Sequence, residues 1–368
     1  MKIKKIILVG GGTGGHASPI GSIYGMLRHG DPELDILVIG SGSTEEKVFF
    51  EKIPTYRTIR AGKLHRYFTL KNIAELINFF IGFFQSFLVV ASFKPDLIFS
   101  KGGYVSLPVI LSAKVLRVPY MFHESDIEMG KANRFMAKDA KKVFVSYPVN
   151  YYPDISSNRL VFSGPILRPG FLSKTDVSAF QFEENKPTIL VTGGSQGSLN
   201  ITRTFLEVGQ SLLREYNVIH QAGKNSINEA NLFLDKLSIQ ERGSYYLRTV
   251  LPIDHGDGMA AAISLSDVVI TRAGSTILEI AAMKKPMILI PWQHAASDHQ
   301  NKNADFFLEN KAAIVIREKD LSSKLLYSEI KNLLCDSKKM EQISKSAGEL
   351  IPKDGLDSVV NAILSEVI

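Results

Sequence analysis

The chain has 368 residues, too many for one ordinary hydrophobic core, so its length predicts two domains. Apolar residues make up 45% and charged residues 22% of the chain, which excludes a largely disordered protein. The net charge of +6 admits anionic lipid, a phosphorylated substrate or nucleic acid as partner, and the scattering of the basic residues argues against nucleic acid. A single cysteine, Cys335, excludes an internal disulfide and favours a reducing cytoplasm.

The amino terminus is predicted to form a strand at residues 6–9 that runs into a loop of five glycines ending at His16. Its apolar run is too short for a signal peptide. Glycines let backbone N–H groups approach a phosphate, and the following helix favours negative charge. The spacing fits a dinucleotide fingerprint, but the second strand, residues 35–39, ends at Gly40 without the ribose-binding acid, which disfavours a dehydrogenase. We expect His16 to act in function, with a structural histidine as the alternative.

A nearly continuous apolar helix is predicted within residues 63–93, after the basic residues Lys63 and Arg66. Polar residues interrupt it, which makes it a poor bilayer span. The side chains expected to pack inward are Phe80, Phe84, Phe87 and Leu88. One interpretation is a helix buried among its neighbours. The other is an interfacial patch in which Phe79 and Phe83 enter lipid beside the basic residues.

Two further strand ends in the first half carry polar groups. Gly102, Gly103 and Tyr104 follow a strand at residues 95–100, and His-Glu-Ser-Asp closes the next strand. Because parallel strands end at one edge of a sheet, these groups are expected to face one crevice. We expect at most one of Glu124 and Asp126 to face substrate and the other to cap the helix near Gly130.

Prolines and glycines at residues 164–170 predict a connection between domains. The expected domains are residues 1–163 and 164–345, and the C-terminal helix, residues 346–368, is expected to pack back on the first domain. Arg168 in the connection either reaches a diphosphate or is a solvated surface arginine.

The second half repeats the same order of elements. A strand after Pro187 leads to a third glycine loop with Ser195, and a βαβ unit at residues 267–304 ends in His299-Gln300. Glu279 in the helix of this unit suits the hydroxyl groups of a ribose. Alternatively, it closes a capping box with Thr276.

The motifs GGTGGH, GGYVS, HES, GGSQG, TRAGS and DHQ, in this order, closely resemble those of the MurG-type transferases of peptidoglycan synthesis. The resemblance covers nearly the whole chain and implies the α/β GT-B fold, with two Rossmann-like doubly wound parallel-sheet domains. It also implies inverting transfer of N-acetylglucosamine from UDP-GlcNAc to lipid I, the undecaprenyl diphosphate-linked N-acetylmuramyl-pentapeptide, which makes lipid II. The implied setting is the cytoplasmic face of the cell membrane, with an anionic membrane surface and a cell-wall synthesis complex as further partners.

The resemblance also implies roles for single residues. His16 is the expected base, and Glu124 is a second candidate. The residues expected near the donor or its diphosphate are Thr13, Gly14, Gly15, Asp126, Arg168, Ser195, Ile253, Ser275, Thr276, Glu279 and Gln300. Those expected near the acceptor or the membrane are Gly102, Gly103, Tyr104, Phe79, Phe83, Lys63 and Arg66. No cofactor is expected, and the absence of an Asp-x-Asp pair or histidine cluster at a strand end argues against a metal.

The sequence departs from the family pattern at a few positions. Asp126 stands where many members have asparagine, and the asparagine usual after the third glycine loop falls at Thr202 by count, with Asn200 two positions early. Two rival hypotheses follow. One keeps the fold with another acceptor, such as diacylglycerol, or with 2-epimerase chemistry. The other is a catalytically silent module that binds a nucleotide sugar or a membrane, against which the presence of His16 and Glu124 argues.

Overall fold

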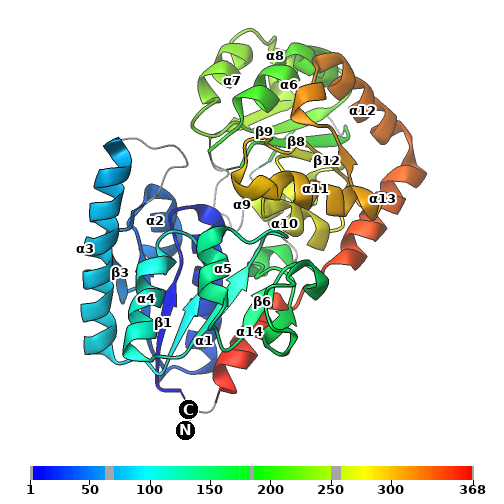
Figure 1. Cartoon of the computed structure of the whole chain (residues 1–368). Helices are drawn as coiled ribbons and strands as arrows, with labels where there is room; N and C mark the ends of the chain where they lie inside the picture. The colour runs from blue at the N-terminus through cyan, green and yellow to red at the C-terminus, as the bar shows by residue number, and fades with distance from the viewer. Residues whose placement is uncertain are drawn as a thin grey trace. The chain divides into compact units, whose positions relative to one another are not determined.

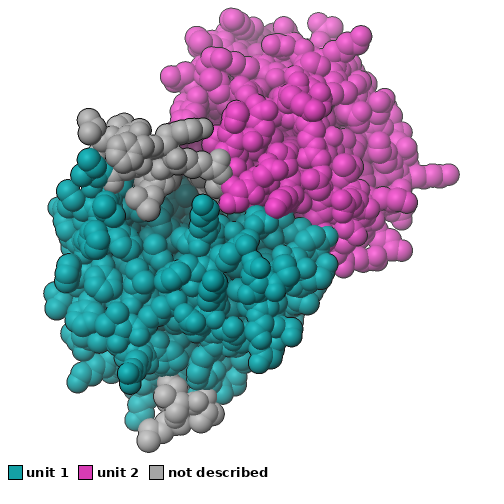
Figure 2. All heavy atoms as spheres, viewed as in Figure 1, with its two compact units in different colours: residues 1–168, 352–368 teal, residues 169–351 magenta. Residues whose placement is uncertain are grey.

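The computed structural model describes residues 3–62, 70–173, 175–178, 180–182, 186–194, 196–249 and 258–366. It divides into two compact units, coloured separately in Figure 2. Unit 1 comprises residues 1–168 and 352–368, and unit 2 comprises residues 169–351. The chain therefore passes from one unit to the other twice, a few residues after each boundary expected from the sequence.

Unit 1 is built on a seven-stranded sheet in the order β3-β2-β1-β4-β5-β6-β7, in which every pair is parallel. Its strands are β1 (Lys5–Val9), β2 (Asp35–Gly40), β3 (Tyr56–Thr58), β4 (Leu97–Ser100), β5 (Tyr120–Glu124), β6 (Val143–Val145) and β7 (Leu160–Phe162). The inner strands are apolar and buried along their length because helices cover both faces of a parallel sheet.

The helices of unit 1 come largely from the crossovers between its strands (Figure 1). They are α1 (Gly14–Gly30), α2 (Thr44–Phe50), α3 (Leu70–Phe93), α4 (Ser106–Leu116), α5 (Lys131–Ala137) and α14 (Gly355–Leu364), with 3₁₀ turns η1 (Val149–Tyr151) and η2 (Ser157–Arg159). The last of these helices, α14, packs beside α1 and brings the end of the chain back to unit 1.

Unit 2 has a six-stranded parallel sheet in the order β10-β9-β8-β11-β12-β13. Its strands are β8 (Thr188–Thr192), β9 (Asn217–Gln221), β10 (Tyr245–Arg248), β11 (Val268–Thr271), β12 (Met287–Leu289) and β13 (Ile314–Val315). Its helices are α6 (Leu199–Leu213), α7 (Ile227–Leu234), α8 (Ile239–Gly243), α9 (Gly258–Leu265), α10 (Thr276–Ala282), α11 (His299–Glu309), α12 (Ser323–Cys335) and α13 (Ser337–Leu350), with 3₁₀ turns η3 (Pro169–Phe171), η4 (Ala296–Asp298) and η5 (Glu318–Asp320).

The two sheets share one topology. In each, the strand order reverses direction once, between β1 and β4 in unit 1 and between β8 and β11 in unit 2. Such a switch point opens a crevice at the carboxyl ends of the strands, where α/β proteins bind ligands. The glycine motifs follow these four strands, so the prediction that they gather at the carboxyl ends of a doubly wound sheet is confirmed within each unit.

The core of unit 1 includes residues from both ends of the chain. Side chains of α14, among them Val359 and Ile363, pack in one cluster with Ile6 and Leu8 of the first strand. The returning backbone runs so close that a Cβ on Gly164, which has φ +73°, would lie 2.1 Å from the carbonyl oxygen of Pro352. Only glycine fits that contact and that conformation.

The prediction that Phe80, Phe84 and Leu88 of α3 pack inward is wrong, because all three side chains are exposed. Phe87, which was also predicted to pack inward, is half-buried. A Cβ on Gly82 would lie 1.8 Å from the carbonyl oxygen of Arg60, and the Ser112 hydroxyl of α4 donates to the Phe83 carbonyl at 3.4 Å, so this face packs on the protein. Phe79 and Phe83 are half-buried on it. The opposite face leaves an apolar stripe exposed, formed by Ile73, Leu76, Ile77, Phe80, Phe84 and Leu88. The near-continuous apolar sequence did not fix the rotation of the helix.

Candidate active site

At the switch point of unit 1, two carboxylates accept hydrogen bonds from amides of the first glycine loop. Glu46 is fully buried and accepts hydrogen bonds from the Gly12 amide, from Ser41 Oγ at 2.5 Å and from the Gly42 amide at 2.8 Å. Glu45 accepts one from the Gly14 amide at 3.1 Å. The carboxylates at this loop therefore come from α2 and not from the end of the second strand. Because these two amides face carboxylates, a phosphate is disfavoured directly at Gly12 and Gly14.

His16 lies in the first turn of α1, where the first and second glycine loops meet. Its Nδ1 is 3.2 Å from the carbonyl oxygen of Lys101, and because a carbonyl only accepts, Nδ1 carries the proton and Nε2 the lone pair. A Cβ on Gly103 would lie 3.2 Å from Cδ2 of the ring. Among the described residues, no hydrogen-bond partner is placed at Nε2. Burial and the positive charge of Lys101 lower the His16 pKa to about 4, so the ring is neutral at pH 7.

Lys101 is a buried cation that no sequence motif singled out. The register of the sheet sets Val9 beside Ser100, so the first loop and Lys101 begin next to each other. The side chain is 1% exposed, and Nζ donates to Ser125 Oγ at 2.7 Å. Burial lowers the pKa of Lys101, and the negative charges of Glu124 and Asp126 act against that shift.

Glu124 ends β5 and is fully engaged by neighbouring donors. One carboxylate oxygen accepts from the amides of Ser125 and Asp126 at 2.7 and 3.0 Å, and the other accepts from Asn133 Nδ2 at 2.9 Å. Asn133 in turn accepts from the Gly103 amide at 3.4 Å. Burial, followed by the charge of Asp126, raises the Glu124 pKa. With the residue 2% exposed, this carboxylate is placed to order the second glycine loop.

The remaining predicted residues of unit 1 lie around these loops. The Tyr104 ring occupies the space above Gly12, where a Cβ would lie 2.2 Å from Cε1 of that ring. Asp126 is half-buried, and its carbonyl accepts from the Tyr152 hydroxyl at 2.9 Å. The Arg168 guanidinium lies 5.8 Å from the centre of the Phe49 ring. The N-cap of the next helix is Gly130 rather than Glu124 or Asp126, so the expectation that one of them caps it is wrong.

The third glycine loop, at the switch point of unit 2, is organised by neutral groups. Thr192 at the end of β8 donates to Gln221 at 2.5 Å and accepts from the Gly194 amide at 3.1 Å. Ser198 then caps α6 by accepting from the Ile201 amide at 3.4 Å. The Gly194 amide thus donates to a hydroxyl and the Gly197 amide to the Gly194 carbonyl at 2.9 Å, so both amides face neutral oxygens.

An ion pair braces the same edge of the unit 2 sheet. Arg272 follows β11 and contacts Glu318 at 2.5 Å, and Glu318 also accepts from Asn200 Nδ2 at 2.9 Å. Burial acts to raise the Glu318 pKa, but hydrogen bonds from Arg272 and Asn200 outweigh it and lower that pKa. Thr202 instead bonds His220 in the core at 3.2 Å. Asn200 therefore occupies the surface position that counting along the sequence gave to Thr202.

The predicted donor residues of unit 2 follow the adjacent strands β11 and β12. Helix α10 begins at Thr276, and its N-cap is Ser275, whose side chain makes no capping hydrogen bond. The predicted capping box of Thr276 and Glu279 is therefore wrong, because Thr276 is already the first residue of the helix. Glu279 is half-buried in its first turn. Gln300, in the first turn of α11, accepts from the Trp292 amide at 2.9 Å.

Four predicted residues, Lys63, Arg66, Ser195 and Ile253, lie outside the described residues. Within the described part of the chain, no group of three histidine, cysteine or acidic side chains is placed to hold a metal ion.

Two family models match consecutive parts of the chain. Residues 6–145 match the glycosyltransferase family 28 N-terminal domain, and residues 188–358 match the family 28 C-terminal domain. The chain belongs to glycosyltransferase family 28. It is 33% identical over 366 residues to a UDP-N-acetylglucosamine–N-acetylmuramyl-(pentapeptide) pyrophosphoryl-undecaprenol N-acetylglucosamine transferase of Clostridium kluyveri, covering 98% of this chain and 99% of the relative.

Solved structures agree on the fold. A crystal structure of Acinetobacter baumannii MurG aligns with a TM-score of 0.71 at 21% identity, covering 98% of this chain and 99% of that one. A putative UDP-N-acetylglucosamine 2-epimerase from Listeria monocytogenes aligns almost as well, with a TM-score of 0.70 at 13% identity, covering 98% and 95%. The GT-B fold is therefore confirmed, but fold similarity does not distinguish transferase from epimerase, and the sequence relatives do.

Proposed function

We propose that the chain is an inverting glycosyltransferase that moves N-acetylglucosamine from UDP-GlcNAc to the C4 hydroxyl of lipid I and so makes lipid II. The full-length relatives support the reaction, and the observation that carries the chemistry is His16. A neutral imidazole, with Nδ1–H fixed on a backbone carbonyl and Nε2 turned away from that bond, is the form that a general base requires.

In the proposed reaction, Nε2 of His16 takes the proton of the acceptor hydroxyl. The hydroxyl oxygen forms a bond to the anomeric carbon of N-acetylglucosamine from the face opposite UDP. The bond between that carbon and the diphosphate oxygen breaks, and UDP leaves with the electron pair. Lys101 acts on this step through His16, because its carbonyl fixes the ring and its charge disfavours the imidazolium before the acceptor arrives.

Glu124 has a positioning role in this proposal. Its oxygens already receive three hydrogen bonds, two from its own turn and one from Asn133, and the residue is 2% exposed, so a substrate hydroxyl has little access to the carboxylate. It fixes Asn133 and, through it, the amide of Gly103 beside the His16 ring.

Unit 2 is proposed to hold the donor, with Glu279 on the ribose hydroxyls and Gln300 on the transferred sugar. The neutral setting of the third glycine loop suits the diphosphate of UDP better than the carboxylate-filled first loop does. Ser275 and Thr276 remain predicted donor contacts, as do Arg168, Thr13 and Gly15 on the unit 1 side.

We place the enzyme at the cytoplasmic face of the cell membrane, docked through the exposed stripe of α3. By length and composition, α3 is the one described helix that could cross a membrane. Its other face packs on α4, which favours docking over spanning. Phe84 and Leu88 are 64% and 68% exposed, so this stripe replaces Phe79 and Phe83 as the proposed lipid contact.

Vesicle binding tests the docking proposal. Phe84→Glu should weaken sedimentation with anionic phospholipid vesicles at least several-fold and leave the fold intact, because the side chain is exposed. Val115→Glu, at a position on α4 that is 62% exposed, is the matched control. Equal binding by wild type and Phe84→Glu would rule out this stripe as the lipid contact.

The activity itself is tested with radiolabelled UDP-GlcNAc and a short-chain lipid I analogue. A labelled disaccharide product is expected. Conversion of UDP-GlcNAc to its 2-epimer without an acceptor would establish the epimerase instead, and donor binding without any product would establish the silent module.

A further inference from the structure

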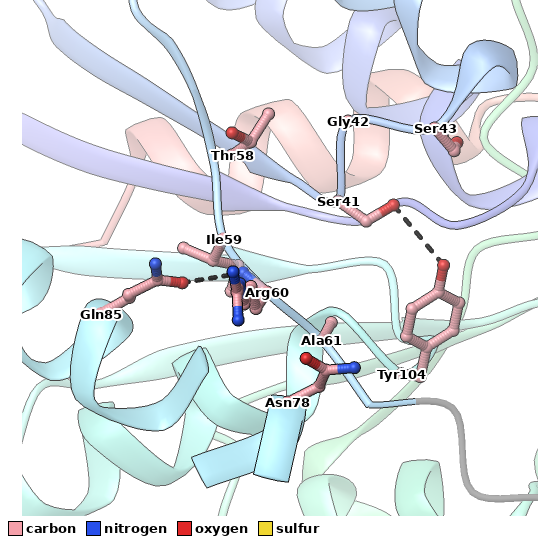
Figure 3. Close-up of a pocket in the computed structure, with 10 residues that line it drawn as sticks. All are labelled: Ser41, Gly42, Ser43, Thr58, Ile59, Arg60, Ala61, Asn78, Gln85 and Tyr104. Carbon is pink, nitrogen blue, oxygen red and sulfur yellow. Dashed lines mark hydrogen bonds between the residues drawn. The ribbon is translucent and has the colours of Figure 1, made fainter. Parts of the chain in front are cut away.

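A polar pocket of about 600 Å³ opens in unit 1 beside the second glycine loop (Figure 3). Its wall comes from the loop between β2 and α2, from the segment after β3, from α3 and from Tyr104. The side chains that can bond a ligand there include Ser43, Thr58, Arg60, Asn78, Gln85 and Tyr104. Tyr104 belongs to a motif that the sequence analysis identified, and the other lining residues named here do not.

The described part of the lining is rich in hydrogen-bond donors and includes the cation Arg60. The Arg60 amide donates to Gln85 Oε1 at 2.8 Å, and this bond fixes the Gln85 side chain with its NH₂ group left to donate elsewhere. Among the described lining residues, Arg60 is the charged one and none is a carboxylate. Glu46 lies behind Ser41 and Gly42, where hydrogen bonds from both compensate its charge. This chemistry selects an anion with several acceptor oxygens.

The location of the pocket restricts the kind of anion. On one side, Tyr104 follows Gly103, where an added Cβ would lie 3.2 Å from Cδ2 of the His16 ring. On the other side, Asn78 and Gln85 belong to α3, the helix whose exposed stripe includes Ile77, Phe80 and Phe84. A ligand that uses all three regions has an apolar chain at α3, an anionic group in the pocket and a hydroxyl near His16.

We infer that this pocket binds the diphosphate that joins the sugar of the acceptor to its polyprenyl chain, with Arg60 as the ionic contact and Gln85 as a hydrogen-bond donor. This inference rests on the proposed function and adds a subsite to it. It assigns the acceptor diphosphate to the segment after β3 and to α3, away from the Gly12 and Gly14 amides that carboxylates already occupy.

Arg60→Ala and Gln85→Leu test the inference, with Arg57→Ala as the matched control. Arg57 is exposed in β3, three residues before Arg60, and does not line the pocket. The substrates are UDP-GlcNAc and two soluble short-chain acceptors that carry the same sugar-peptide, one through a diphosphate and one through a monophosphate. Short chains keep membrane docking out of the measurement.

For Arg60→Ala, KM for the diphosphate acceptor should rise about tenfold, as expected for a lost charge-assisted hydrogen bond. KM for UDP-GlcNAc should stay within about twofold, and the monophosphate acceptor should lose less affinity than the diphosphate one. Gln85→Leu should change the same constants in the same direction by less. An unchanged acceptor KM, an equal loss for both acceptors, or a parallel rise in the donor KM would each overturn the assignment.

If wild type and Arg57→Ala make no disaccharide, the proposed function fails, and the pocket is then judged by binding alone. Calorimetric titration of the diphosphate acceptor into wild type and Arg60→Ala gives that answer. Weaker binding by Arg60→Ala supports the subsite, and equal binding or no binding to wild type removes it.

Discussion

The two sheets of this enzyme have the same strand order, yet their switch points are built from different chemistry. In unit 1, a neutral histidine lies against a buried lysine, a buried glutamate and carboxylates that occupy loop amides. In unit 2, hydroxyl and amide groups organise the third glycine loop, and Arg272 and Glu318 nearby form an ion pair with each other. In the proposed function, one topology therefore supplies a site for moving a proton and, separately, a site for holding a nucleotide.

The difference fits what each site does in the proposed function. A base needs a controlled pKa, which requires burial and nearby charge, and both act on His16, the proposed base. A diphosphate carries its own charge, so its site needs donors without a competing carboxylate. Substitutions in unit 1 should therefore change turnover or acceptor binding, and substitutions in unit 2 should change donor binding.

The largest effect is expected for His16→Ala. Turnover should fall about 10³-fold, within the range for loss of a general base, and the dissociation constant of UDP-GlcNAc should change little. Steady-state kinetics and donor titration measure the two quantities. His29→Ala, at an exposed position of the same helix, is the control. An equal loss of turnover and donor affinity would assign His16 to the donor.

Lys101→Met should lower both stability and activity at acid pH. Removing the Lys101 charge leaves the negative charges of Glu124 and Asp126 without a nearby opposite charge, at a cost of about 3 kcal/mol in the free energy of unfolding. It should also raise the His16 pKa from about 4 towards its ordinary value of 6.5. Because the protonated ring cannot act as a base, the acid limb of kcat/KM should move to higher pH.

Urea unfolding and a pH–rate profile measure these two changes. Lys52→Met, at an exposed position just after α2, is the control. A destabilised variant whose acid limb stays in place would mean that Lys101 is only structural.

Glu279→Ala tests the donor half of the comparison. KM for UDP-GlcNAc should rise about tenfold because the ribose hydroxyl groups lose a charged acceptor, while the acceptor KM stays unchanged. Glu309→Ala, at the exposed end of α11, provides the control. A rise confined to the acceptor KM would contradict the division of labour between the two units.

The smallest effect is expected for Glu124→Gln. The amide keeps an acceptor oxygen for its own turn but loses the charged contact to Asn133, so kcat/KM should fall only about fivefold. Steady-state kinetics of Glu124→Gln and His16→Ala, measured side by side, compare the two losses in kcat/KM. A loss as large as that of His16→Ala would make Glu124 the base.

The sequence predicted the parts of the site that glycine and strand patterns mark. The strand ends before Gly10, Gly102 and Gly193 were recognised because an apolar β-branched run that stops at a glycine pair is typical of a buried strand followed by a tight loop. The glycine loops that follow were placed correctly at the carboxyl edge of each sheet.

Other features depend on tertiary contacts that no local pattern signals. A lysine in a glycine motif is read as exposed, yet Lys101 is buried by the strand register between β1 and β4. Glu46 was passed over because it lies beyond the end of the second strand and reaches the first loop only through α2. On α3, apolar residues occur on every side, so the exposed face was decided by backbone contacts at Gly82.

The return of α14 to unit 1 has a consequence for biosynthesis. Val359 and Ile363 complete the cluster that surrounds the first strand, so unit 1 lacks part of its interior until α14 leaves the ribosome. Unit 2 lies wholly between the two crossings, so we expect it to fold first although it is translated second. A nascent chain stalled before residue 352 should therefore resist protease in its later part while its earlier part is still digested.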